Sequence, residues 1–140
     1  MNIKKTMKII ATVAASYIGL VILFESSLGF FQPEADETII ITTVDEQGQP
    51  HDRVVSRFES GNELFIAANH WPRAWFQRVL QNLELGVLID GELGRYKAVL
   101  LEGPEHERLA REYNPGLVFR FLTGFPPRYF LRLDPIESEY

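Results

Sequence analysis

The sequence predicts a mainly β domain with inserted helices (α+β class), a six-stranded antiparallel β-barrel preceded by an N-terminal transmembrane helix. Three observations lead to this prediction. An uncharged stretch of sixteen residues stands near the N-terminus. Short segments rich in β-branched and aromatic residues follow it, separated by turn-forming residues. Most of these segments are joined by short turns, which connect antiparallel neighbours, and a closed or half-open barrel removes exposed sheet edges.

The first 31 residues differ in composition from the rest of the chain. Lys4, Lys5 and Lys8 precede the uncharged run at residues 9–24, which as a helix would be about 24 Å long at roughly 1.5 Å per residue. A bilayer core is about 30 Å thick, but lysine side chains can extend a short span. We expect residues 1–31 to form an uncleaved signal anchor, with a cleaved signal peptide and a buried helix as the alternatives. Basic residues favour the cytoplasmic side, so the domain is expected outside the cytoplasm.

Residues 32–37 (QPEADE) are predicted to be a linker, and residues 38–140 the folded domain. From residue 32 onward the chain has 11 Lys and Arg against 18 Asp and Glu. Phosphate neutralisation requires clustered basic residues, so we expect no nucleic-acid partner. The chain has no cysteine, which excludes disulfides, thiolate nucleophiles and cysteine-ligated metals.

The domain alternates between strand and helix patterns. A helix beginning at Pro72, a residue suited to the first helical turn, is expected over 72–83. Its apolar face would carry Trp75, Val79, Leu80 and Leu83. A second helix is expected over 103–113 with Leu109 facing inward. The connector at 114–127 is expected to be part helical. Phe125 is expected in the core, with a role in covering a ligand as the alternative. Strands are expected at 38–44, 51–58, 63–68, 84–90, 95–102 and 128–136.

The stretch AANHWPRAWFQR at residues 67–78 combines aromatic and basic residues where a strand leads into a helix. Backbone N–H groups at a helix start attract phosphate or carboxylate. Arg73 and Arg78 would add charge-assisted donors, Trp71 or Trp75 a stacking face, and Asn69 a cap. The alternative interpretation is that Trp75 anchors the helix on the barrel and the arginines are solvated.

A second basic group occurs in the strand HDRVVSR. His51, Arg53, Val55 and Arg57 share one face because side chains alternate along a strand. If this face borders the helix start, it forms an anion pocket; otherwise it is an exposed strand face. The three histidines have no metal-ligand spacing, and Ser56 and Ser60 lack a nucleophile motif. We therefore assign no metal ligand and no catalytic side chain.

The order of these motifs resembles the deazaflavin-dependent nitroreductase family, whose members are split β-barrels related to pyridoxamine-phosphate-oxidase-like flavoproteins. The similarity covers residues 38–136. It depends on the motif A-N-H-x-P-R-A-W-F, on Q-N-x-E, and on the following VLIDGELGRYKAVLLEG. The family has an Asn-Pro-Glu turn at the second motif, where this chain has Leu83. The resemblance implies a six-stranded split antiparallel β-barrel that binds 8-hydroxy-5-deazaflavin (factor 420) or FMN and transfers hydride to a quinone or nitro compound. In such proteins the cofactor carries the chemistry.

The resemblance also implies a set of cofactor contacts and a possible homodimer. The expected contacts are Arg53, Ala68, Asn69, His70, Arg73 and Trp75. One departure concerns the first turn, which in the family carries Gly-Arg-Lys-Ser-Gly and holds the anionic tail of the coenzyme. Here Asp45 and Glu46 occupy that turn and should repel such a tail. The tail is then held by His51, Arg53 or Arg73, or the cofactor is a shorter flavin, or binding is lost. A non-catalytic ligand-binding or accessory protein tethered to the membrane is the alternative function.

Overall fold

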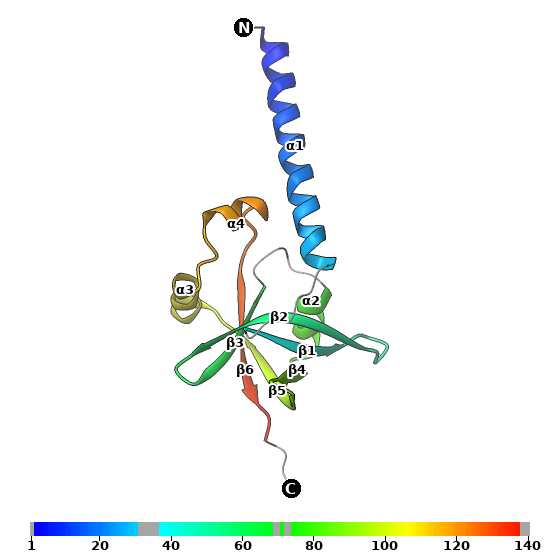
Figure 1. The fold of residues 1–140 in the computed structure, drawn as a ribbon, viewed down its shortest axis with the longest axis vertical. Coiled ribbons are helices and arrows are strands. Elements are labelled where there is room, and N and C mark those ends of the chain that lie inside the picture. The colour runs from blue at the N-terminus through cyan, green and yellow to red at the C-terminus, as the bar shows by residue number, and fades with distance from the viewer. Residues whose placement is uncertain (1, 31–36, 69–70, 72–73, 138–140) are drawn as a thin grey trace.

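A computed structural model describes residues 2–30, 37–68, 71 and 74–137 of the chain. Within them, six antiparallel strands close into a barrel in the order β1-β2-β3-β6-β5-β4 (Figure 1). Three neighbouring pairs are hairpins, and the other three join strands that are distant in sequence. The predicted antiparallel barrel is confirmed, with strand ends within three residues of those expected. The strands are β1 (Thr38–Val44), β2 (Pro50–Ser60), β3 (Glu63–Ala68), β4 (Glu84–Ile89), β5 (Glu92–Leu100) and β6 (Tyr129–Pro135).

Four helices accompany the barrel in the described part of the chain: α1 (Ile3–Phe30), α2 (Ala74–Gln81), α3 (Gly103–Glu112) and α4 (Leu117–Leu122). The helices α2 and α3 follow the third and fifth strands, as the sequence predicted. The expected helical start at Pro72 lies outside the described residues.

The helix α2 is packed against the barrel core through one face. Trp75, Phe76 and Val79 are buried and belong to the same apolar cluster as inward residues of the strands. Leu80 and Leu83 are 40% and 39% exposed, so the prediction that they continue this face was wrong. The helix is only eight residues long, and a single face of so short a helix meets the strands.

The helix α3 covers the outer face of β3 and β6. Leu109 is fully buried there, as predicted, in a second cluster with Phe65 and Phe130. The side chain of Phe130 therefore points away from the barrel interior, whereas Leu131 and Leu133 belong to the barrel core cluster. This two-sided burial places β6 between the barrel core and α3.

The helix α1 projects away from the barrel (Figure 1). Among the described residues it is the one helix long and apolar enough to cross a membrane, over Ile3–Leu28 with a mean hydropathy of 2.1. None of that apolar window is buried inside the protein. The alternative that this segment is a buried helix was therefore wrong. A signal anchor and a signal sequence both remain compatible with an exposed apolar helix near the N-terminus.

The helix α4 confirms that the aromatic-rich connector is part helical. It ends in a Schellman motif: the Phe125 N–H donates to the Arg120 carbonyl (2.8 Å), and the Gly124 N–H to the Phe121 carbonyl (3.2 Å). Gly124 has φ 78° and Phe125 has φ 54°. A left-handed conformation costs a residue with a Cβ about 1–2 kcal/mol. Phe125 is 47% exposed, so the expectation that it lies in the core was wrong.

Candidate functional site

Three of the six residues predicted to contact a cofactor lie in the described part of the chain. Arg53, Ala68 and Trp75 are placed, whereas Asn69, His70 and Arg73 lie outside the described residues. Ala68 is the last residue of β3, is 3% exposed and pairs with Tyr129 of β6. A ligand at this position would meet the end of the strand rather than a functional side chain.

Trp75 is 5% exposed and belongs to the barrel core cluster. Its indole packs edge-on against Phe76, with ring centroids 5.7 Å apart, and Phe76 packs in turn against Tyr129 at 5.0 Å. Such aromatic pairs contribute to stability beyond the area they bury. The geometry favours the interpretation in which Trp75 anchors α2 on the barrel and stiffens the start of the helix.

Arg53 lies on the inward face of β2. In the β1–β2 register, Arg53 is opposite Ile41, and His51 is opposite Thr43. Ile41 and Val55 are both in the core cluster, so Arg53 and Val55 lie on the inner face of the barrel. His51, near the start of the strand on the same face, is exposed, and Arg57 is half-buried opposite Ile66. Arg53 is half-buried, and its Nη2 donates to the Leu28 carbonyl of α1 at 3.4 Å. The Arg53 side chain therefore lies where β2 meets the end of α1.

Thr43 and Arg78 form a polar contact at the same end of the barrel. Thr43 is only 3% exposed; its Oγ1 accepts a hydrogen bond from Arg78 Nε at 2.9 Å and donates to the His51 carbonyl at 3.4 Å. The sequence analysis did not single out Thr43. The sequence feature that could have identified Thr43 is a polar residue at an inward-facing position of the strand TIIITTV.

The guanidinium of Arg78 is half-buried and, among the described residues, forms no ion pair with a carboxylate. An arginine side chain has five N–H donors, and the contact with Thr43 uses the one on Nε. The terminal nitrogens can therefore still donate to an anion, and the bond to Thr43 fixes the direction in which they point.

In the acidic turn between β1 and β2, the Asp45 carboxylate forms its hydrogen bonds with nearby residues of the same hairpin. Asp45 Oδ2 lies 2.7 Å from His51 Nε2, and Asp45 Oδ1 accepts the N–H groups of Gln47 and Gln49, each at 2.9 Å. The hydrogen bond with His51 is the main cause of the lowered pKa of Asp45, and the backbone bond from Gln49 adds to it. His51 thus faces Asp45. This arrangement weakens the idea that His51 holds a ligand anion.

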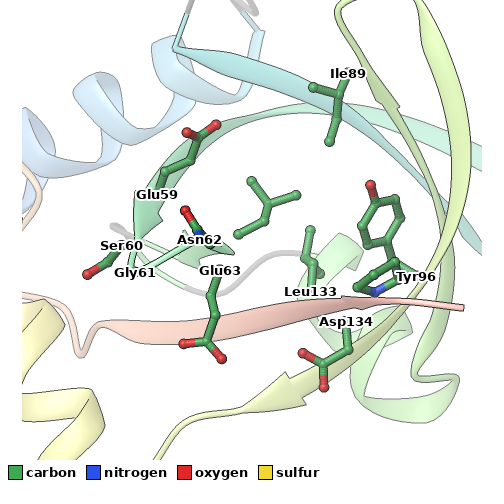
Figure 2. A pocket seen from close by; sticks show the side chains of 11 residues that line it. Glu59, Ser60, Gly61, Asn62, Glu63, Ile89, Tyr96, Leu133 and Asp134 are labelled. Carbon is green, nitrogen blue, oxygen red and sulfur yellow. The ribbon is translucent and has the colours of Figure 1, made fainter.

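The opposite end of the barrel is an open mouth with a different electrostatic character (Figure 2). It contains a cavity of 590 Å³ at the β2–β3 turn. Glu59, Glu63 and Asp134 line it beside the apolar side chains of Leu64, Ile89 and Leu133. The strand β3 starts at this mouth and ends at Ala68, shortly before α2 begins. The two ends of the barrel are therefore separated by the length of β3.

The arginines near the open mouth are already paired with carboxylates. Arg132 lies 2.7 Å from Asp134 and 3.7 Å from both Glu63 and Glu105. Arg57 lies 3.2 Å from Asp90 and 3.9 Å from Glu59. These five acids outnumber the two arginines and Lys97, which is opposite Asp134, so an anionic ligand would be repelled from the open mouth. An anion is better accommodated at the α2 end, next to Arg78.

Comparison with known proteins gives the fold. No protein-family model matches the sequence, and no curated protein matches it. Among solved structures, an F420-H2-dependent reductase (FDR-A) superposes with a TM-score of 0.58 at 18% identity, over 70% of this chain and 94% of the other. The chain has the split β-barrel fold. The expectation of a split barrel related to pyridoxamine-phosphate-oxidase-like proteins is confirmed at the level of fold.

Other structures with this fold differ in what they bind. A pyridoxamine 5'-phosphate oxidase-related, FMN-binding protein from Nostoc punctiforme matches with a TM-score of 0.53 at 14% identity, covering 72% of this chain and 71% of that one. HutZ, the haem storage protein from Vibrio cholerae, matches with a TM-score of 0.53 at 16% identity, over 82% and 92%. A further match is a domain-swapped dimer, with a TM-score of 0.57 at 18% identity over 70% and 80%. The split barrel thus serves both redox and storage proteins.

Proposed function

We propose that this protein is a membrane-anchored oxidoreductase that binds a flavin or deazaflavin at the α2 end of the barrel and passes hydride to a quinone or nitro compound. The observation that carries the proposal is the half-buried Arg78, fixed by Thr43 and without a carboxylate partner among the described residues. The fold adds support, because proteins described as F420-H2-dependent or FMN-binding share it.

The residues at the α2 end fit an anionic cofactor. Arg78 offers guanidinium donors beside a buried hydroxyl, and charge-assisted hydrogen bonds of this kind are about twice as strong as neutral ones. Arg53 lies on the same inner face, and its pair with Ile41 is two register positions from the pair of Thr43 with His51. The acidic turn is less repulsive than the sequence suggested, because Asp45 is paired with His51.

In this proposal the bound cofactor supplies the hydride, and the protein positions it. Arg53 and Arg78 bind its phosphate or anionic tail. Ala68, Asn69, His70 and Arg73 stay proposed contacts around the start of α2. Trp75 supports this helix from the core side. No side chain is required as nucleophile or acid–base catalyst.

The proposal places α1 in the membrane, with the N-terminus in the cytoplasm and the domain outside. The three lysines before the apolar run motivate this orientation. A quinone is then available from the bilayer. We also propose that the chain forms a homodimer, for which the motivation is that a protein of the same fold is a domain-swapped dimer.

Binding and turnover are tested on the full chain in detergent micelles. The protein is titrated into FMN and, separately, into 8-hydroxy-5-deazaflavin, and quenching of cofactor fluorescence is recorded. We expect saturable binding of at least one. The reduced cofactor is then mixed with a soluble quinone and with a nitroaromatic compound, and oxidation is followed by absorbance. Absence of binding to both cofactors removes the proposal.

The alternative is a non-catalytic ligand-binding or accessory protein. Its support is that the acidic turn departs from the coenzyme-binding pattern and that a haem storage protein has the same barrel. The same experiment separates the two functions. Cofactor binding without any protein-dependent oxidation by quinone or nitro compound favours the non-catalytic protein.

A further inference from the structure

The connector around α4 exposes a concentration of large apolar side chains. Leu117 and Val118 are 72% and 74% exposed, and Phe121 and Phe125 are 48% and 47% exposed. Trp71 is 47% exposed, and its Nε1 donates to the Thr123 carbonyl at 2.8 Å, which fixes the indole to the end of α4. We call these five residues the α4 patch. Exposed apolar groups gathered in this way indicate a contact with another apolar surface.

The α4 patch lies beside the apolar helix α1. Tyr17 Oη donates to the Phe121 carbonyl at 2.9 Å, and the two rings are 4.9 Å apart. Phe24 packs edge-on against Phe119 at 6.1 Å. Val21 is so close to Gly124 that a Cβ on the glycine would lie 3.1 Å from it. Residues at positions 17, 21 and 24 share one face of a helix, so this face of α1 packs along α4 and forms a seam with it.

This seam limits how α1 can enter a bilayer. If residues 17–24 stayed outside the membrane with α4, the inserted helix would be residues 3–16, about 21 Å long. A hydrocarbon core of about 30 Å would not be spanned. With residues 17–24 inserted, the helix over residues 3–24 is about 33 Å long, which is sufficient. Because α4 is packed on residues 17–24, it must then enter the same leaflet.

The depth of α4 also suits a membrane interface. The seam covers residues 17–24 of α1, the last 12 Å or so of the uncharged run, and the first acidic residue, Glu25, follows directly. Interfacial helices bury their apolar face about 5–10 Å into the boundary between headgroups and acyl chains. Aromatic residues such as Trp71 and Tyr17 are favoured at that level. The patch and the membrane boundary thus coincide.

Two arginines border the patch and complement anionic lipid. Arg120 is exposed on α4 and lies 5.5 Å from the centre of the Phe125 ring. Arg128 is half-buried; burial lowers its pKa, and the nearby charge of Arg120 lowers it further. Both side chains are positively charged, and anionic lipid headgroups attract such charges at the membrane surface.

We propose that the α4 patch is embedded in the outer boundary of the bilayer beside α1, so that the domain is held to the membrane by two elements. This inference rests on the proposed membrane insertion of α1. It also places Trp71, three residues before α2 begins, at the lipid surface. A lipid-soluble acceptor would then reach the candidate cofactor site from the membrane.

Single-cysteine labelling tests the inference, because the natural chain has no cysteine. Full-length V118C, L93C and V13C proteins each receive an environment-sensitive fluorophore and are reconstituted into vesicles of phosphatidylcholine and phosphatidylglycerol. Val118 and Leu93 are matched, at 74% and 75% exposure. Leu93 lies in the β4–β5 hairpin, near the end of β6 that is remote from α1 (Figure 1). Val13 reports on α1. Circular dichroism confirms that each labelled protein is folded.

Each labelled protein is exposed to a lipid-bound nitroxide and to iodide in the buffer. We expect the Val118 and Val13 probes to show blue-shifted emission, quenching by the nitroxide and loss of quenching by iodide, while the Leu93 probe responds to iodide alone. A Val118 probe that responds like the Leu93 probe overturns the inference and leaves the anchor intact. If the Val13 and Val118 probes are both quenched by iodide and not by the nitroxide, the inference and the proposed membrane insertion of α1 are both overturned. A Val118 probe shielded from both quenchers indicates a second protein copy on the patch and also overturns it.

Discussion

The two ends of the barrel are built from the same strands but have opposite properties. At the α2 end, core side chains fill the barrel, and Arg78 lies beside Thr43 without a carboxylate partner in the described part of the chain. At the β2–β3 end, a cavity of 590 Å³ is open and acidic, and Arg57 and Arg132 are each paired with at least two carboxylates. This open cavity is therefore unsuitable for an anionic cofactor. Electrostatics, and not the volume of a cavity, separates the two ends.

The largest effect is expected from removing the core side chain at the α2 end. Trp75→Ala should lower the free energy of unfolding by about 3–5 kcal/mol, because it leaves a cavity in the core. Tyr96→Ala at the open mouth should cost less, since this side chain is half-exposed to the cavity. Chemical denaturation of the full chain in detergent measures both changes. A stable Trp75→Ala protein with weakened cofactor binding would reassign Trp75 to the ligand.

The second effect concerns Arg78, which has no carboxylate partner among the residues that the structure describes. Arg78→Ala should weaken FMN or deazaflavin binding about 10- to 100-fold, since a hydrogen bond from a charged group contributes roughly 1.5–3 kcal/mol. Arg108→Ala is the matched control, because Arg108 lies on α3 and bonds to Ser60 and Glu112. Fluorescence titration gives the dissociation constants. Equal dissociation constants for the two variants would show that the cofactor does not bind next to Arg78.

A smaller effect is expected in the turn at the α2 end. The pKa of Asp45 is lowered from 3.8, mainly by the hydrogen bond with His51. Because its pKa is lower in the folded state, the ionised Asp45 carboxylate stabilises the fold. This contribution is fully present above pH 3.8, the ordinary pKa of the group, and is lost as the pH falls through the folded-state pKa. His51→Ala should raise the pKa of Asp45. The variant should be less stable than the natural chain at neutral pH, and this difference should become smaller in acid. NMR titration of the carboxyl carbon measures this; an unchanged pKa would show that the backbone bonds alone hold the turn.

The smallest effect is expected at the open mouth. A Glu59→Gln/Glu63→Gln double variant should change cofactor affinity by no more than about twofold. At about 3.3 Å per residue, Glu63 and Ala68 at the two ends of β3 are roughly 17 Å apart, which exceeds the Debye length of about 8 Å at physiological salt. The same fluorescence titration checks it. Markedly tighter binding after removal of these charges would place the cofactor in the acidic mouth.

Local sequence patterns predicted most of the fold. Alternation and turn residues placed all six strands, and the helical spacing of Trp75 and Val79 placed the buried face of α2. The same patterns failed for Leu80 and Phe125, whose exposure depends on which neighbours the barrel supplies. For the candidate site, the shared face of His51 and Arg53 followed from alternation, whereas its orientation toward the barrel interior did not.

The sequence by itself determined the strand order along the chain, the apolar N-terminal helix, the absence of cysteine chemistry and the acidic balance of the domain, because these properties depend on composition and on neighbouring residues. Only the tertiary structure decided that Arg78 meets Thr43, that His51 faces Asp45, and that Tyr17 meets Phe121, 104 residues away. Contacts between distant residues depend on barrel closure and strand register. Local spacing does not contain that information.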